Sequence, residues 1–236
     1  SIAVGPNRFE TVIPDDVEAP DGGFNIRLRE ERHDAEIRQH RHTIYAALSF
    51  ARANQIDRIA IDSPHPRLGI LTAGKSYLDV RQALDDLGID EAMAAEIGLR
   101  VYKAGMVWPL EPSGVSAFAH GLEEVLVVEE KRAVMENQLR EQLYNWPDAV
   151  RPRVVGKFDE NDEWLLPSAG EQSPAMVARV IAARIARFHT SLQVADRLAE
   201  IEAREQSLAA AHNIIERMPY FCSGCPHNTS TKVPEG

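Results

Sequence analysis

The fold is decided by the stretch Leu68-Gly69-Ile70-Leu71-Thr72-Ala73-Gly74-Lys75-Ser76. The apolar run from Leu68 to Thr72 is followed by two small turn residues and then by a helical pattern from Ser76 to Leu87. A short apolar run bounded by turn signals is typical of a buried strand, and a longer periodic stretch is typical of a helix. The stretch therefore predicts a strand that leads directly into a helix.

The same alternation continues along the chain. Further apolar runs predict strands at 99–102, 125–128 and 154–158, and amphipathic stretches predict helices at 112–121 and 132–144. Strands that alternate with helices form right-handed crossovers and a parallel sheet that is buried on both faces. The predicted fold class is therefore α/β, a Rossmann-like three-layer domain with a mostly parallel sheet and flanking helices.

The segments on either side of this domain differ from it in composition. The first 32 residues contain three prolines and two adjacent glycines without periodicity, which predicts an extended connector. Helical spacing predicts one amphipathic helix at 34–54, and Ser173 followed by Pro174 predicts the start of another helix, which ends near Phe188. The expected division is a connector at 1–32, a helix and a short strand leading in at 33–66, the α/β domain at 67–190, a long helix at 191–218 and a tail at 219–236.

Composition excludes several classes of function. The formal net charge of -10 argues against nucleic acid as a partner, because phosphate contacts need clustered Lys and Arg. No apolar run approaches the roughly 20 residues of a membrane span, and the first residues lack the pattern of a secretory signal. Cys222 and Cys225 are the only cysteines, so a disulfide framework is excluded and a cytoplasmic location is expected.

Gly69 to Ser76 also matches the phosphate-loop pattern of Gly, four residues, Gly, Lys and Ser. In a phosphate loop the strand ends before the first glycine, and the next four residues wrap around phosphate. Here Ile70 and Leu71 are expected to be the strand itself, which leaves a turn too short for phosphate. We treat the match as accidental, and a free-standing nucleotide-binding module remains the alternative. Glu129 and Glu130 superficially offer acids for magnesium, but we interpret them as ordinary surface residues at a strand end.

Residues 221–227, Phe-Cys-Ser-Gly-Cys-Pro-His, form the one motif whose residue types carry chemistry. Two thiolates separated by two residues can bind one metal ion or iron atom from the same turn, and Gly224 allows a sharp backbone. Four ligands are usual, so Cys222 and Cys225 are half of a site unless His227 contributes. A redox dithiol is disfavoured, because a long helix rather than a strand precedes the pair. The remaining interpretation is two unligated thiols.

The run from Tyr220 to Thr229 resembles the start of the thiamine-diphosphate-binding domain of indolepyruvate:ferredoxin oxidoreductases, which belong to the 2-oxoacid:ferredoxin oxidoreductases. The resemblance covers about residues 60–236. It is supported upstream by Gly69-Ile70-Leu71-Thr72-Ala73-Gly74, Gly105-Met106-Val107-Trp108-Pro109-Leu110-Glu111-Pro112 and Val127-Val128-Glu129-Glu130-Lys131. The most similar members are the long fused bacterial chains, of which this chain resembles an internal fragment.

The resemblance implies a parent enzyme that decarboxylates a 2-oxo acid of the arylpyruvate type on thiamine diphosphate with Mg²⁺. Electrons would leave singly through [4Fe-4S] clusters to a ferredoxin-like acceptor, and coenzyme A would take the acyl group. The implied partners of this chain are other domains of the same polypeptide, in a homo-oligomer. Its own fold would be the transketolase C-terminal-like domain between the two thiamine-binding halves.

Residue by residue, the resemblance transfers only Cys222 and Cys225, as candidate iron–sulfur ligands in the full-length parent. The activating carboxylate and the magnesium-binding motif of the family have no counterpart in this sequence. We therefore expect no catalytic residue and no bound cofactor in this chain alone. The leading hypothesis is a structural and assembly domain, which is inactive by itself.

Overall fold

The computed structural model describes residues 10–25, 27–210 and 220–232. The chain forms two compact units, residues 1–201 and 202–236. The finer division that the sequence suggests remains a prediction. Within the described residues, no helix has the length and apolar character needed to cross a membrane.

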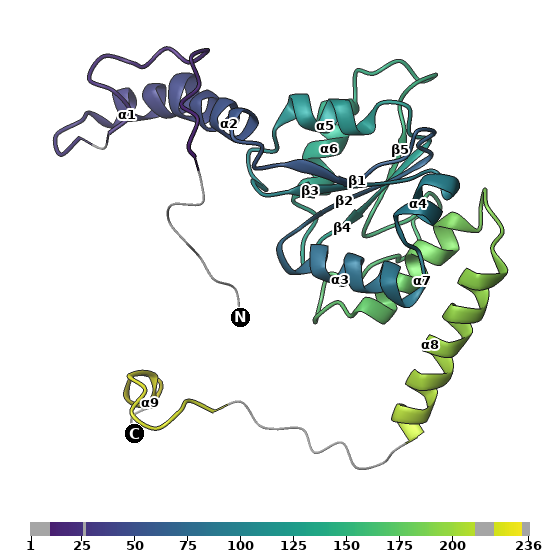
Figure 1. The fold of residues 1–236 in the computed structure, drawn as a ribbon. Helices are drawn as coiled ribbons and strands as arrows, with labels where there is room; N and C mark the ends of the chain where they lie inside the picture. The colour runs from purple at the N-terminus through teal and green to yellow at the C-terminus, as the bar shows by residue number, and fades with distance from the viewer. Residues whose placement is uncertain (1–9, 26, 211–219, 233–236) are drawn as a thin grey trace. The chain divides into compact units, whose positions relative to one another are not determined.

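The first unit is built on a five-stranded sheet with the order β1-β3-β2-β4-β5 (Figure 1). In chain order, the strands are β1 Arg58–Ile61, β2 Leu68–Ala73, β3 Leu99–Ala104, β4 Glu124–Val128 and β5 Arg153–Val155. β2 pairs in parallel with β3 and β4, and β4 pairs in parallel with β5. Only β1 is antiparallel, paired with β3 at the edge. The predicted mostly parallel sheet is therefore confirmed.

Helices cover both faces of this sheet, which confirms the three-layer prediction. α3 and α7 lie together on one face, and α5 and α6 lie on the other (Figure 1). The helices are α3 Gly74–Asp86, α4 Glu91–Ile97, α5 Pro112–Ala119, α6 Met135–Leu143 and α7 Pro174–Ile185. Ser173 caps α7 as predicted, because its side-chain oxygen accepts the N–H of Met176 at 3.2 Å.

Side chains of the central strand β2 contribute to two hydrophobic cores. Leu68 and Ile70 belong to the core that α3 and α7 cover, whereas Leu71 belongs to the core that α5 and α6 cover. Gly69 has a packing role, since a Cβ at this position would meet Cζ of Phe118 on α5 at 2.7 Å. The absence of a side chain at Gly69 lets the helix approach the sheet closely.

A helical segment precedes the sheet. It consists of α1 Arg32–Arg38, the π-helical turn η2 Gln39–Thr43 and α2 Ile44–Ala53, so the helix predicted at 34–54 is confirmed. Arg52 ties this segment to the α/β domain, because its Nε donates to Oε1 of Glu111 at 3.1 Å. Residues 10–25 and 27–31 contain no helix or strand.

Several elements differ from the prediction. β5 ends at Val155 rather than at Phe158. Beyond this point the N–H of Lys157 donates to Oε2 of Glu136 at 3.0 Å and not to the neighbouring strand. α7 ends before the predicted Phe188, and α4 was not predicted at all.

The second unit begins within α8, which spans Leu192–Ala210. The long helix predicted at 191–218 is confirmed as far as Ala210, and residues 211–218 lie outside the described residues. A short helix that was not predicted, α9 His227–Ser230, follows the cysteine motif.

Candidate functional site

The topology of the sheet creates one position at which a ligand would be expected. The chain leaves β2 for α3 on one face and leaves β4 for α6 on the opposite face (Figure 1). In open α/β sheets, ligands bind outside the carboxyl ends of the strands at such a switch point. The ends of β2 and β4 therefore form the first candidate site.

Lys75, in the first turn of α3, connects the two strand ends, and its charge is already paired. Its Nζ donates to Oδ2 of Asp79 at 2.8 Å, to Oε1 of Glu130 at 3.3 Å and to the carbonyl oxygen of Gln172 at 2.9 Å. The hydrogen bond to Asp79, supported by that to Glu130, raises the pKa of Lys75. Two carboxylates beside the ammonium group would repel an incoming phosphate.

The phosphate-loop pattern at Gly69 to Ser76 does not form a phosphate loop. β2 runs from Leu68 to Ala73, and α3 begins at the next residue, Gly74. The interpretation that placed Gly69 inside a strand is confirmed. A phosphate loop needs its strand before the first glycine and free amides after it, and here most of those amides belong to a strand.

We therefore expect no specific binding of ATP with magnesium. Titration calorimetry should show no saturable heat for the wild-type chain or for Lys75→Ala, because Asp79 and Glu130 already neutralise this lysine. Glu130→Gln serves as the matched control, since it removes one competing carboxylate and keeps the lysine. Saturable binding that Lys75→Ala abolishes would contradict this account and favour the nucleotide-binding alternative.

Glu129 lies at the end of β4 and is only 8% exposed, so its interpretation as an ordinary surface residue is wrong. Its carboxylate accepts the backbone N–H groups of Val134, Met135 and Glu136 at 3.0, 2.9 and 3.0 Å. These groups lie at the start of α6, where the N-cap residue Val134 has no side-chain oxygen. Glu129, five residues before the N-cap position, thus takes over the capping of α6.

Lys157 is a second buried charge at this edge, at 3% exposure. Its Nζ donates to the carbonyl oxygens of Glu129 and of Pro167, the latter at 3.3 Å. Burial lowers the pKa of Lys157, although Glu129 and Glu136 oppose the shift. Gln172 donates from Nε2 to the same Glu129 carbonyl at 2.9 Å. The hydrogen bonds of Lys157 and Gln172 hold loops to the end of β4, so we assign these two side chains a structural role.

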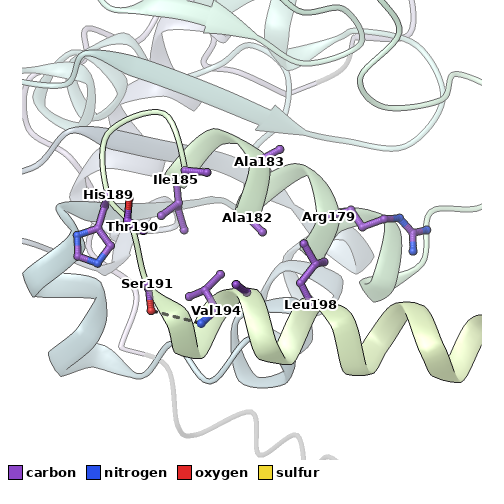
Figure 2. A pocket seen from close by; sticks show the side chains of 11 residues that line it. Arg179, Ala182, Ala183, Ile185, His189, Thr190, Ser191, Val194 and Leu198 are labelled. Carbon is purple, nitrogen blue, oxygen red and sulfur yellow. Dashed lines mark hydrogen bonds between the residues drawn. The ribbon is translucent and has the colours of Figure 1, made fainter.

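A hollow between α7 and α8, with a volume of about 250 Å³, is the second candidate site. Figure 2 shows Ala182, Ala183 and Ile185 on one helix, Val194 and Leu198 on the other, and the turn from His189 to Ser191 at one end. The N–H of Val194 donates to the hydroxyl of Ser191 at 3.3 Å and fixes the start of α8. The walls are mainly methyl groups, which provide packing surface rather than groups for acid–base chemistry.

The cysteine motif forms a closed turn in the second unit. The N–H of Cys225 donates to the carbonyl of Cys222 at 3.0 Å, and Gly224 has a φ of 82°. Both thiols are free, with Cys222 exposed and Cys225 partly buried. Across the described ranges, no three His, Cys, Asp or Glu side chains gather as a metal site requires. The two thiols fit half of a ligand set, and their role as ligands stays a prediction.

Comparison with known sequences decides the family. The sequence model of the indolepyruvate ferredoxin oxidoreductase middle domain matches residues 57–211, which is most of the chain. The chain belongs to this family. The matched residues include all five strands of the sheet, the helices α3 to α7 and the described part of α8.

Two relatives place this middle domain within longer proteins. The indolepyruvate oxidoreductase subunit IorA of Methanothermobacter marburgensis is 30% identical over 75% of this chain and 24% of its own length. The same subunit of Thermococcus kodakarensis is 29% identical over 70% of this chain and 22% of its own length. The chain therefore spans about a quarter of the length of the relatives that it matches.

Two solved structures are also similar to this indolepyruvate ferredoxin oxidoreductase middle domain. One is a 2-oxoglutarate:ferredoxin oxidoreductase from Magnetococcus marinus, with a TM-score of 0.43 and 16% identity over 72% of this chain and 26% of that chain. The other is a split-gene transketolase, with a TM-score of 0.37 and 14% identity over 55% of this chain and 41% of that chain.

Sequence reasoning missed two features of the candidate sites. The capping role of Glu129 could have been anticipated, since Val134 cannot cap α6 and an acid lies five residues before it. The position of His227 beside Cys225 depends on the short helix α9, which the sequence pattern did not reveal.

Proposed function

We propose that this chain is a structural and assembly domain of an enzyme that oxidatively decarboxylates 2-oxo acids of the arylpyruvate type to acyl-CoA. The observation that carries the proposal is the family match over residues 57–211, which covers the folded α/β domain. The candidate site at the ends of β2 and β4 supports it, because its charged groups are used for internal contacts. The hollow between α7 and α8 supports it because its walls are mainly apolar. The chain alone is expected to be inactive.

The proposed parent uses thiamine diphosphate with Mg²⁺ and [4Fe-4S] clusters. The residues of this chain do not fit the thiamine cofactor, since no counterpart of its activating carboxylate or its magnesium-binding motif occurs in the sequence. The chemistry of Cys222 and Cys225 does fit a cluster, because both thiols are free and both belong to the same turn. They would supply two ligands, and the others would come from outside this chain.

In this proposal the α/β domain holds its neighbours in position, and the cysteine turn helps to hold a carrier of single electrons. A bound cluster would supply one-electron transfer to a ferredoxin-like acceptor. Cys222 and Cys225 would hold it as thiolates, and the closed turn fixes the separation of their main chains. Other domains of the same polypeptide, a homo-oligomeric assembly, coenzyme A and a cytoplasmic location belong to the same proposal.

The iron content of the longer polypeptide tests the role of the cysteines. Cys222→Ser or Cys225→Ser should lower the bound iron by about one cluster per chain, because serine replaces a thiolate ligand. Ser223→Ala, within the same turn, is the matched control and should leave the iron content unchanged. If the wild type and the three variants contain equal amounts of iron, Cys222 and Cys225 are not ligands of the cluster.

A further inference from the structure

His227 lies directly beside one thiol of the cysteine turn. Its Nδ1 is 3.2 Å from Sγ of Cys225, within hydrogen-bonding distance for sulfur. The imidazole ring stacks on Phe221, with ring centroids 5.1 Å apart and planes at 24°. The ring is therefore held by an aromatic neighbour in an orientation that directs one nitrogen at the sulfur.

The backbone around this pair is fixed by several hydrogen bonds. The carbonyl of Cys222 accepts the N–H of Cys225 and the Nδ2 of Asn228, both at 3.0 Å. The hydroxyl of Thr231 donates to the carbonyl of His227, which also accepts the N–H of Thr231 at 3.1 Å. The thiol and the imidazole thus belong to one segment, residues 220–232, which is closed by its own hydrogen bonds.

We propose that His227 donates a hydrogen bond from Nδ1 to the sulfur of Cys225 and thereby raises the reduction potential of the cluster that Cys225 holds. The inference rests on the proposed function of the cysteines. A thiolate ligand has no proton to give, so the ring nitrogen must be the donor. Hydrogen bonds to cluster sulfurs are among the factors that set the reduction potentials of iron–sulfur clusters.

The direction of the effect follows from charge. One-electron reduction adds a negative charge that is shared with the ligating sulfurs, and no bond forms or breaks at Cys225. The N–H dipole of His227 stabilises the reduced form more than the oxidised form, so it favours reduction. His227 is a positioning residue in this scheme and does not bind the cluster.

The geometry favours a donor over a third ligand. Among the described residues, Cys222, Cys225 and His227 do not come together in an arrangement that could hold a metal ion. Nδ1 faces the sulfur itself. A hydrogen bond uses the arrangement as it stands, whereas ligation through His227 would require the turn to rearrange.

Two variants of the longer polypeptide distinguish the effect of the N–H donor of His227 from the effect of its aromatic ring. His227→Phe keeps an aromatic ring that can stack on Phe221 but removes the N–H. His227→Asn removes the ring but places an amide N–H close to the position of Nδ1. Iron content and the midpoint potential, followed by redox titration with electron paramagnetic resonance, are measured for both variants and for the wild type.

We expect unchanged iron in both variants, a more negative midpoint potential in His227→Phe, and a potential near that of the wild type in His227→Asn. Loss of iron in His227→Phe alone would overturn the inference, because this variant also removes a ring nitrogen that could bind iron. Equal potentials in His227→Phe and the wild type would overturn the inference, as would equal loss of iron in both variants. A wild-type protein whose iron does not depend on Cys222 or Cys225 would instead overturn the proposed function itself.

Discussion

Replacing Glu129 with alanine should lower the free energy of unfolding by about 2–4 kcal/mol, since three charge-assisted hydrogen bonds are lost and buried amides are left without a partner. The carboxylate accepts three consecutive N–H groups at the start of α6, at 2.9–3.0 Å. Val134, at the N-cap, has no side chain that could replace it. Urea unfolding followed by circular dichroism measures the change.

Glu130→Ala is the matched control for this experiment. Glu130 is the next residue, and its side chain is 28% exposed and paired with Lys75 at 3.3 Å. Partly exposed ion pairs contribute about 0–1 kcal/mol, so this variant should unfold within that margin of the wild type. If Glu129→Ala and Glu130→Ala lower the free energy of unfolding by the same amount, Glu129 is not the cap of α6.

Arg184→Met should lower the free energy of unfolding by about 3–5 kcal/mol, because the buried carboxylate of Glu124 loses both hydrogen bonds from Arg184 and keeps only the more distant Arg153, at 3.7 Å. Arg184, in the last turn of α7, is 5% exposed, and Glu124, at the start of β4, is 9% exposed. Nε of Arg184 donates to Oε1 of Glu124 at 2.6 Å, and Nη2 reaches both Oε2 of Glu124 and Oε2 of Glu160, the latter at 2.9 Å. The guanidinium group thus joins α7 to the sheet.

Arg197→Met is the control for Arg184. Arg197 and Glu200 form an ion pair at 3.1 Å on α8, but their side chains are 53% and 62% exposed. The expected change is within about 0.5 kcal/mol, since exposed pairs are screened by water. If Arg184→Met lowers the free energy of unfolding no more than Arg197→Met does, the buried pair does not hold α7 on the sheet.

The same cluster makes stability depend on pH. A hydrogen bond from its own backbone N–H, with ion pairs to Arg184 and Arg187, lowers the pKa of Glu160 from 4.5 to about 2. The stabilisation is present above pH 4.5 and is lost as the pH falls towards 2, because the unfolded chain binds the proton first. The difference in stability between the wild type and Glu160→Gln should therefore shrink over this range.

The sheet was predictable from sequence because its central strands are buried on both faces. The runs that became β2 and β4 are almost continuously apolar, a pattern that is typical of parallel strands under two helical layers, whereas Arg100 and Lys103 interrupt the run of β3. The antiparallel direction of β1 was not predictable, since strand direction depends on pairing with β3 rather than on the composition of Arg58–Ile61.

α4 shows a signal that was present but not used. Asp90 caps this helix by accepting the N–H of Met93 at 2.8 Å, and Gly98 ends it with a φ of 88°. An acid before a helix and a glycine after it are standard boundary signals. The helix has only seven residues, however, and its apolar periodicity is too short to stand out.

The candidate sites were less predictable than the fold. The failure of the phosphate-loop pattern could be argued from the position of the strand, and β2 confirms that argument. The networks around Glu129 and Arg184 join residues that lie 43 and 60 positions apart, as in the contacts with Gln172 and Glu124. Contacts between such distant residues depend on the tertiary fold, so no local pattern announces them.

The central claim is that this domain supports an oxidoreductase without catalysing the reaction. The direct test is to measure arylpyruvate-dependent reduction of an added one-electron acceptor, with coenzyme A and thiamine diphosphate present, for the 236-residue chain and for the longer polypeptide that contains it. We expect turnover by the longer polypeptide and none by the chain. Turnover by the isolated chain would contradict the assignment of a structural and assembly domain.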